Sequence, residues 1–123
     1  MATLANRVYD NGLTVLDTEA NRVDICSSEP STYTAATSTN TLGNTTSITI
    51  SAPTDGDTSG RKVTLSAISG ASVTATGTAT HYAITDTSNT RLLVTGSLSS
   101  SQSVTSGNTF SLTAVDIEIP DPA

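Results

Sequence analysis

The sequence has very few aromatic residues and a single cysteine. It contains no tryptophan, one phenylalanine and three tyrosines. Because Cys26 is alone, an intrachain disulfide is excluded. Cys26 belongs to the mostly apolar segment Val23–Cys26, and free cysteines in such segments are usually buried as small apolar residues. We therefore expect a structural Cys26 and not a reactive thiol.

Basic residues are scarce as well. The sequence has five lysines and arginines and eleven aspartates and glutamates, so the formal net charge is −6 at pH 7. Nucleic acids and anionic membrane surfaces are bound by clusters of cations, so we expect neither as a partner. No apolar run approaches the ~20 residues that span a bilayer. Residues 1–7 lack the hydrophobic region of a signal peptide, which predicts a protein made in a cytoplasm.

Hydroxyl side chains are abundant instead. The chain has 25 threonines and 18 serines among its 123 residues. Threonine is β-branched and suits the surface of a sheet, whereas serine favours turns. Alternating Val, Ile and Leu side chains recur between turn residues, which is typical of a folded β protein. The sequence predicts an all-β fold: a single β-sandwich or barrel-like domain of about six to eight short antiparallel strands.

The strand signals are unevenly distributed along the chain. Most follow residue 46, which divides the sequence into an N-terminal extension (1–46) and a β core (47–123) of one domain. In the last predicted strand the apolar residues change parity near Ala114, and this indicates a β-bulge. The predicted strands are Arg22–Cys26, Ser47–Ala52, Lys62–Ile68, Ser72–Thr76, Thr78–Thr85, Arg91–Thr95 and Phe110–Ile119. Ser99–Asn108 is predicted as a polar connection around a short strand near Val104.

The N-terminal extension has its own pattern. Leu4, Val8 and Tyr9 share a helical face, but Asn11-Gly12 interrupts it, so the pattern predicts a short helix that ends near Asp10. Residues 31–44 are rich in Thr, Ser and Ala without periodicity, which predicts an extended arm or long loop. A loop of this length inside a small domain indicates contact with a partner. We therefore expect the extension to be a docking segment.

The segment Asp55–Gly60 resembles the first half of an EF-hand calcium loop. An EF-hand loop needs a glutamate at its twelfth position, where this sequence has Ser66, and a helix where this sequence predicts a strand. The segment therefore predicts an Asp/Gly turn, and whether it also binds an ion stays open.

No group of residues predicts a reaction. His81 is the only histidine, which excludes zinc sites with two histidines, and no serine stands out as its catalytic partner. Asp116 and Glu118 share one face of the last strand, where their repulsion predicts solvent or a basic partner. We expect no catalytic, cofactor-binding or metal-ligating residues, and no enzyme. The alternative, a small carbohydrate-active enzyme, has His81 and Asp116 as its candidates.

Five segments carry a resemblance to a known family: Asp10–Leu13, Asn21–Pro30, Gly77–Ile84, Arg91–Leu93 and Ser99–Phe110. Through them most of the chain resembles small structural proteins of tailed phages and prophages. The resemblance implies a virion protein made in the bacterial host cytoplasm. It implies a capsid decoration protein that binds the major capsid protein, or another virion structural protein, on the outer surface of the head as a homo-oligomer. The alternative is a tail- or fibre-associated adhesion module. The resemblance offers no catalytic residues.

Overall fold

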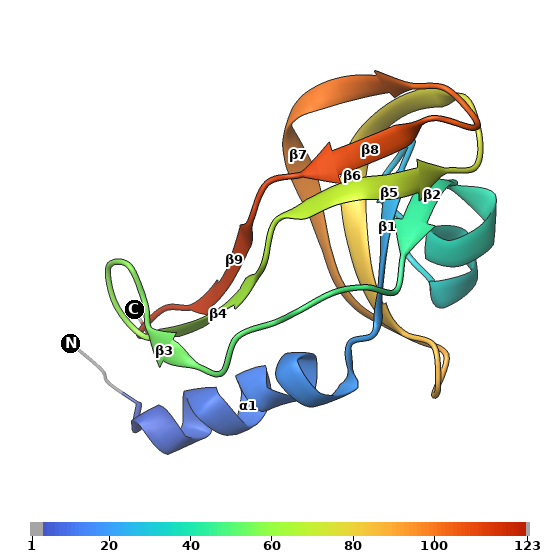
Figure 1. The fold of residues 1–123 in the computed structure, drawn as a ribbon. Coiled ribbons are helices and arrows are strands. Elements are labelled where there is room, and N and C mark those ends of the chain that lie inside the picture. Colours follow the sequence, from blue (N-terminus) through green and yellow to red (C-terminus); the bar gives the residue numbers. More distant parts are fainter. Residues whose placement is uncertain (1–3, 123) are drawn as a thin grey trace. The chain divides into compact units, whose positions relative to one another are not determined.

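A computed structural model describes residues 4–122 of the chain. The predicted β-rich fold class with a short N-terminal helix is confirmed, because antiparallel strands in two sheets account for most of the regular structure (Figure 1). The chain divides into two compact units built from separated segments. The first unit contains Met1–Glu19, Thr49–Ala67 and Thr113–Ala123, and the second contains Ala20–Ile48 and Ile68–Leu112.

The first unit combines one helix with a small sheet. Its elements are α1 (Asn6–Glu19), β3 (Thr54–Asp55), β4 (Arg61–Leu65) and β9 (Val115–Ile119). The sheet has the order β3-β4-β9, and both pairs are antiparallel.

The second unit is a six-stranded antiparallel sheet with the order β7-β6-β1-β2-β5-β8. Its elements are β1 (Arg22–Cys26), the π-helix η1 (Ala35–Thr39), β2 (Thr41–Thr45), β5 (Ile68–Val73), β6 (Gly77–Asp86), β7 (Arg91–Val104) and β8 (Thr109–Leu112).

The helix α1 is longer than predicted. It continues through Gly12 to Glu19 and does not end near Asp10. Tyr9, Leu13 and Leu16 recur at helical spacing and are buried, and α1 packs against β4. Burial of each such side chain contributes about 1.5–3 kcal/mol, whereas a glycine inside a helix costs only about 1 kcal/mol relative to alanine. Burial of these three side chains therefore outweighs the cost of Gly12, and the helix continues past it.

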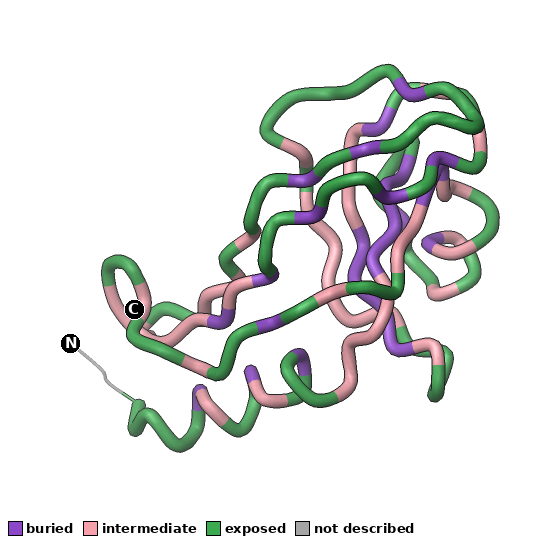
Figure 2. The backbone as a smooth tube through the Cα atoms, in the orientation of Figure 1, coloured by how far each residue is buried: buried purple, intermediate pink, exposed green. Residues whose placement is uncertain are grey.

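Strand β4 supplies the other half of the first unit's core. Val63 and Leu65 are fully buried, as their alternation predicts. The predicted strand over Ser47–Ala52 is reduced to one isolated bridge between Ile50 and Leu65. Figure 2 shows the same alternation, with buried positions separated by partly exposed ones along β4.

The predicted extended arm over residues 31–44 is wrong. This segment forms η1 and then β2, and β2 lies between β1 and β5 in the sheet. Ala36 of η1 is fully buried beside Cys26 and Ala83. The Thr32 hydroxyl accepts a hydrogen bond from the Ala35 N–H (3.0 Å), which helps to start this helical turn. The turn was not predicted because the segment shows no apolar periodicity. Two strands from residues 1–46 are thus central in the sheet, and the boundary between the compact units does not follow residue 46.

Strands β6 and β7 form a long hairpin. The predicted turn at its tip is present, where the Asp86 carboxylate accepts hydrogen bonds from the Ser88 N–H (3.0 Å) and the Asn89 side chain (2.8 Å). Strand β7 then continues to Val104, so the predicted polar connection over Ser99–Asn108 is wrong for most of its length. The register jumps between Ala79↔Gln102 and His81↔Ser97, so β7 contains extra residues that bulge from the ladder.

The predicted bulge near Ala114 is also wrong. Strand β8 ends at Leu112 in the second unit, and β9 begins at Val115 in the first. Phe110 and Leu112 are buried in one sheet, whereas Val115 and Ile117 lie in another. The apolar residues do change parity near Ala114, but the cause is that the chain passes from one sheet to the other at this point.

Candidate functional site

The structure brings Cys26 and His81 together, although they are far apart in the sequence. They are cross-strand partners on β1 and β6. The Cys26 thiol is buried and faces the Ala36 carbonyl oxygen at 3.7 Å. Burial, and then the negative charge of Asp24, raises the pKa of Cys26 to about 12. The thiol is therefore protonated at neutral pH, which is the condition of a structural cysteine.

His81 contacts two hydroxyl groups. Its Nδ1 lies 2.9 Å from the Thr80 hydroxyl, and its Nε2 lies 3.4 Å from the Ser97 hydroxyl on β7. A serine–histidine pair is thus present, but a nucleophilic triad needs an acid on the second ring nitrogen. That position is held here by the neutral hydroxyl of Thr80.

The carboxylates of the calcium-like segment take part in ion pairs. Arg61 binds Asp55 (2.7 Å) and Asp10 (2.8 Å). Lys62 binds Asp57 (2.6 Å) and Asp116 (3.0 Å). Among residues 4–122, no group of three or more His, Cys, Asp or Glu side chains is placed to hold a metal ion.

The last strand meets its basic partner within the chain. Asp116 accepts a hydrogen bond from the Thr64 hydroxyl (2.8 Å) and pairs with Lys62. The Thr64 hydrogen bond first, and Lys62 second, lower the pKa of Asp116 from 3.8. Glu118 accepts the backbone N–H of Asp57 at 2.7 Å. These two carboxylates therefore hold the Asp55–Gly60 loop and β9 together.

An exposed apolar stripe lies on the first unit. Leu4, Val8, Val15 and Ile119 are 43%, 57%, 37% and 38% exposed, and they are the large apolar side chains of the described residues that solvent reaches most. Val8 and Val15 are two turns apart on α1, and a Cβ placed on Gly12 between them would lie 3.9 Å from Ile119. We call these four residues the α1 stripe. The sequence pattern placed Leu4 and Val8 on a helical face with Tyr9, which is buried, whereas Val15 and Ile119 were missed because the predicted helix ends near Asp10.

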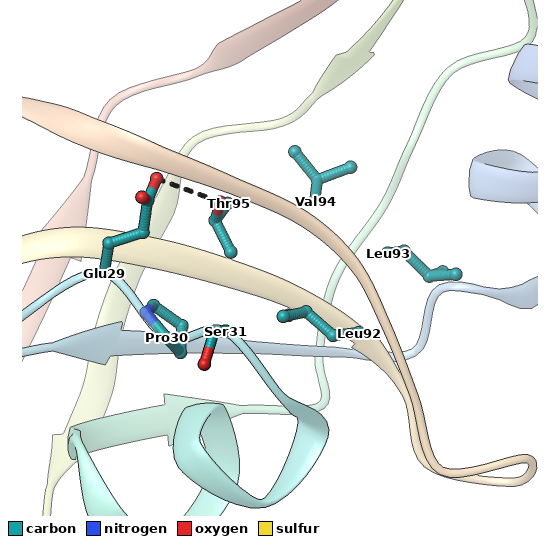
Figure 3. A pocket seen from close by; sticks show the side chains of 7 residues that line it. All are labelled: Glu29, Pro30, Ser31, Leu92, Leu93, Val94 and Thr95. Atoms are coloured by element: carbon teal, nitrogen blue, oxygen red, sulfur yellow. Dashed lines mark hydrogen bonds between the residues drawn. The ribbon is translucent and has the colours of Figure 1, made fainter.

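A shallow pocket of about 320 Å³ opens in the second unit (Figure 3). It lies between the loop after β1 and the first half of β7. The Thr95 hydroxyl donates a 3.3 Å hydrogen bond to the Glu29 carboxylate across it. The lining residues, which we call the β7 pocket, are Glu29, Pro30, Ser31, Leu92, Leu93, Val94 and Thr95.

The pocket adjoins an end strand of the sheet. Strand β7 is that end strand, and among the described strands it pairs only with β6. Side chains normally alternate between the two faces of a strand, so four consecutive lining residues, 92–95, indicate that the alternation is broken here. The ladder skips Leu93, because Ile84 pairs with Val94 and Thr85 with Leu92. The apolar triplet Leu92–Val94 is the sequence signal that could have revealed this bulge, because it breaks the alternation.

Two further observations concern the chain as a whole. None of the helices within residues 4–122 has the length and apolar character needed to cross a membrane. Comparison with family models, with curated proteins and with solved structures found no match to this chain.

Proposed function

We propose that this protein is a structural component of a tailed-phage virion, a capsid decoration protein that binds the major capsid protein on the outside of the head. The proposal assigns it a binding role and no enzymatic one. It takes its biological setting from the sequence resemblance and its mode of action from the surface of the first unit.

Three of the five segments that carry the resemblance are neighbours in the fold. Asn21–Pro30 includes β1, Gly77–Ile84 belongs to β6, and Arg91–Leu93 begins β7. These strands are neighbours in the order β7-β6-β1. The other two segments lie elsewhere, since Asp10–Leu13 is on α1 and Ser99–Phe110 runs from β7 to β8. The resemblance therefore includes a continuous part of one sheet without being limited to it.

The observation that carries the binding role is the α1 stripe. Burying a valine or leucine side chain contributes about 1.5–3 kcal/mol, so leaving Leu4, Val8 and Val15 in water forgoes that gain unless a partner covers them. Contiguous exposed apolar groups bordered by polar residues commonly mark protein–protein contacts. On α1 the acidic residues Asp10 and Asp17 lie on the opposite side of the helix from Val8 and Val15, so they do not separate the exposed apolar groups.

The head surface repeats the same binding site on many copies of the major capsid protein, so weak contacts of many decoration proteins can add up. A decoration protein occurs in many copies, and each copy contributes a small interface to the particle. The net charge of −6 keeps copies of the free chain soluble at high concentration, because like charges repel. Homo-oligomers on the head surface fit the same arrangement.

Quantitative mass spectrometry of purified particles tests the location. We expect a copy number comparable to that of the major capsid protein. A few copies per particle would move the protein to the tail or fibre, and its absence from particles would end the proposal.

A further inference from the structure

We propose that the β7 pocket and the adjoining edge of β7 bind an extended peptide segment of a partner protein, one that alternates apolar side chains with lysine or arginine. The bound segment would add a strand to the sheet beside β7. This site is separate from the α1 stripe, and nothing in it depends on a virion setting.

The edge of β7 provides the main-chain part of the site. An end strand presents N–H and C=O groups that have no partner within its own sheet, and these groups accept another strand readily. Natural edges are commonly protected by charges, prolines or short length. Strand β7 has 14 residues, with no proline and no charged residue after Arg91. Its protection is limited to the bulges, at Leu93 and between Ser97 and Gln102.

The pocket provides the side-chain part of the site. Leu92, Leu93 and Val94 are all half-buried, so each keeps apolar surface available at the edge. A volume of about 320 Å³ is at the small end of ligand pockets and suits individual side chains of a peptide. Added strands gain affinity from the main chain and specificity from pockets of this kind.

Glu29 determines the charge of the occupant. Its carboxylate is exposed at the pocket mouth, and its hydrogen bond from the Thr95 hydroxyl is long at 3.3 Å. A carboxylate has about four acceptor sites, so it has capacity for a further donor. A lysine or arginine on the incoming segment would add a charge-assisted hydrogen bond, whereas an acidic segment would be repelled.

A second copy of the chain does not supply such a segment. Arg22 lies on β1, between β6 and β2, and Arg61 and Lys62 lie on β4, between β3 and β9. Arg7 is on α1, and Arg91 starts β7 itself. These are the five basic residues of the sequence, and none belongs to a segment that alternates apolar side chains with further lysines or arginines, so the occupant we propose is a different protein.

The experiment selects the occupant from a random dodecapeptide library by mRNA display against the full chain. We expect enriched peptides that alternate apolar residues with lysine or arginine. The variant Ser31→Trp fills the pocket from an exposed loop position and should remove the enrichment. The matched variant Ser28→Trp changes the same residue type in the same loop, outside the pocket lining, and should preserve it.

The enriched peptide then tests the mode of binding. Methylation of alternate backbone amides on one parity should abolish binding, and methylation on the other parity should leave it, because only one edge of an added strand faces β7. Glu29→Gln should weaken binding about two- to fivefold, the range measured for exposed ion pairs. Amide chemical shifts should change at residues 29–31 and 92–95.

Three results would each overturn the proposal: no enrichment over Ser31→Trp, enrichment of acidic peptides, or self-association of the chain through β7 in sedimentation experiments. None of these measurements involves a virion. Failure here is therefore distinct from failure of the proposed function, which particle composition decides.

Discussion

The two compact units differ in how they use charge. The first unit contains eight acidic and three basic residues, a net charge of −5, whereas the second contains three acidic and two basic residues, a net charge of −1. The first unit also has all four residues of the α1 stripe. Its surface therefore combines strong charge with exposed apolar groups.

The second unit has fewer charges but buries some of them. Asp24 and Asp86 are buried there, and Asp24 binds Arg22 through two hydrogen bonds of 2.8 Å and accepts a third from the Thr41 hydroxyl (2.7 Å). Charge in this chain therefore has two roles. In the second unit it fixes the sheet from inside, and in the first it joins β4, the Asp55–Gly60 loop and β9 through exposed ion pairs and hydrogen bonds.

The largest effect should follow loss of the buried carboxylate of the second unit. Asp24→Ala leaves Arg22 and Thr41 without their shared acceptor, and breaking a buried pair in this way typically costs about 3–5 kcal/mol of unfolding free energy. Because the Arg22 side chain is 22% exposed, we expect the lower end, about 3 kcal/mol. Urea denaturation measures it, with the exposed Asp17→Asn as control. A loss below about 1 kcal/mol would remove the distinction between the units.

A core truncation tests whether the units open separately. Leu65 of β4 is fully buried, and Leu65→Ala should cost about 2–5 kcal/mol. Hydrogen exchange should accelerate at the amides of β4 and β9 more than at those of β6. The reciprocal variant Ile84→Ala, also fully buried, should show the reverse pattern. Equal acceleration everywhere in both variants would mean that the two units unfold as one.

The smallest effect concerns the contacts of Asp116 with β4 in the first unit. Since the pKa of Asp116 is lowered from 3.8, this group adds stability above that value, and the contribution is lost as the pH falls through the lower, folded pKa. Thr64→Val and Lys62→Met should each raise the pKa of Asp116, because the first removes its largest single stabilising hydrogen bond and the second removes a hydrogen bond and a positive charge. Carbon-13 NMR titration of the carboxyl group measures both shifts. An unchanged pKa in either variant would contradict the contacts described for Asp116.

Local patterns predicted much of the second unit. Alternation located β1 at its observed bounds, and Asp86–Asn89 predicted the hairpin tip. Burial of Cys26 followed from its apolar neighbours. Such features depend on residues close in sequence. By contrast, η1 and β2 depend on packing of Ala36 beside Cys26 and Ala83, which no local pattern among threonines and serines reveals.

The surfaces that matter for binding were harder to predict. The α1 stripe needs a helix that runs past Gly12, and burial of Leu13 and Leu16 decides this. The β7 pocket needs the loop at Glu29 to meet a strand more than sixty residues later, a contact that only the sheet order creates. His81 and Asp116 were the candidate residues of an enzyme, and their contacts are those described above: two hydroxyl groups for His81, and Thr64 and Lys62 for Asp116. The expectation that the protein is not an enzyme stays a prediction.

Binding of the purified chain to heads that lack it tests the central claim most directly. The double substitution Val8→Ser and Val15→Ser changes two exposed side chains of the α1 stripe, so the fold should be retained. We predict at least a tenfold loss of affinity, about 1.4 kcal/mol, for the double variant and no change for Asp17→Asn on another face of α1. Binding of the double variant at the affinity of the unchanged protein would contradict the account.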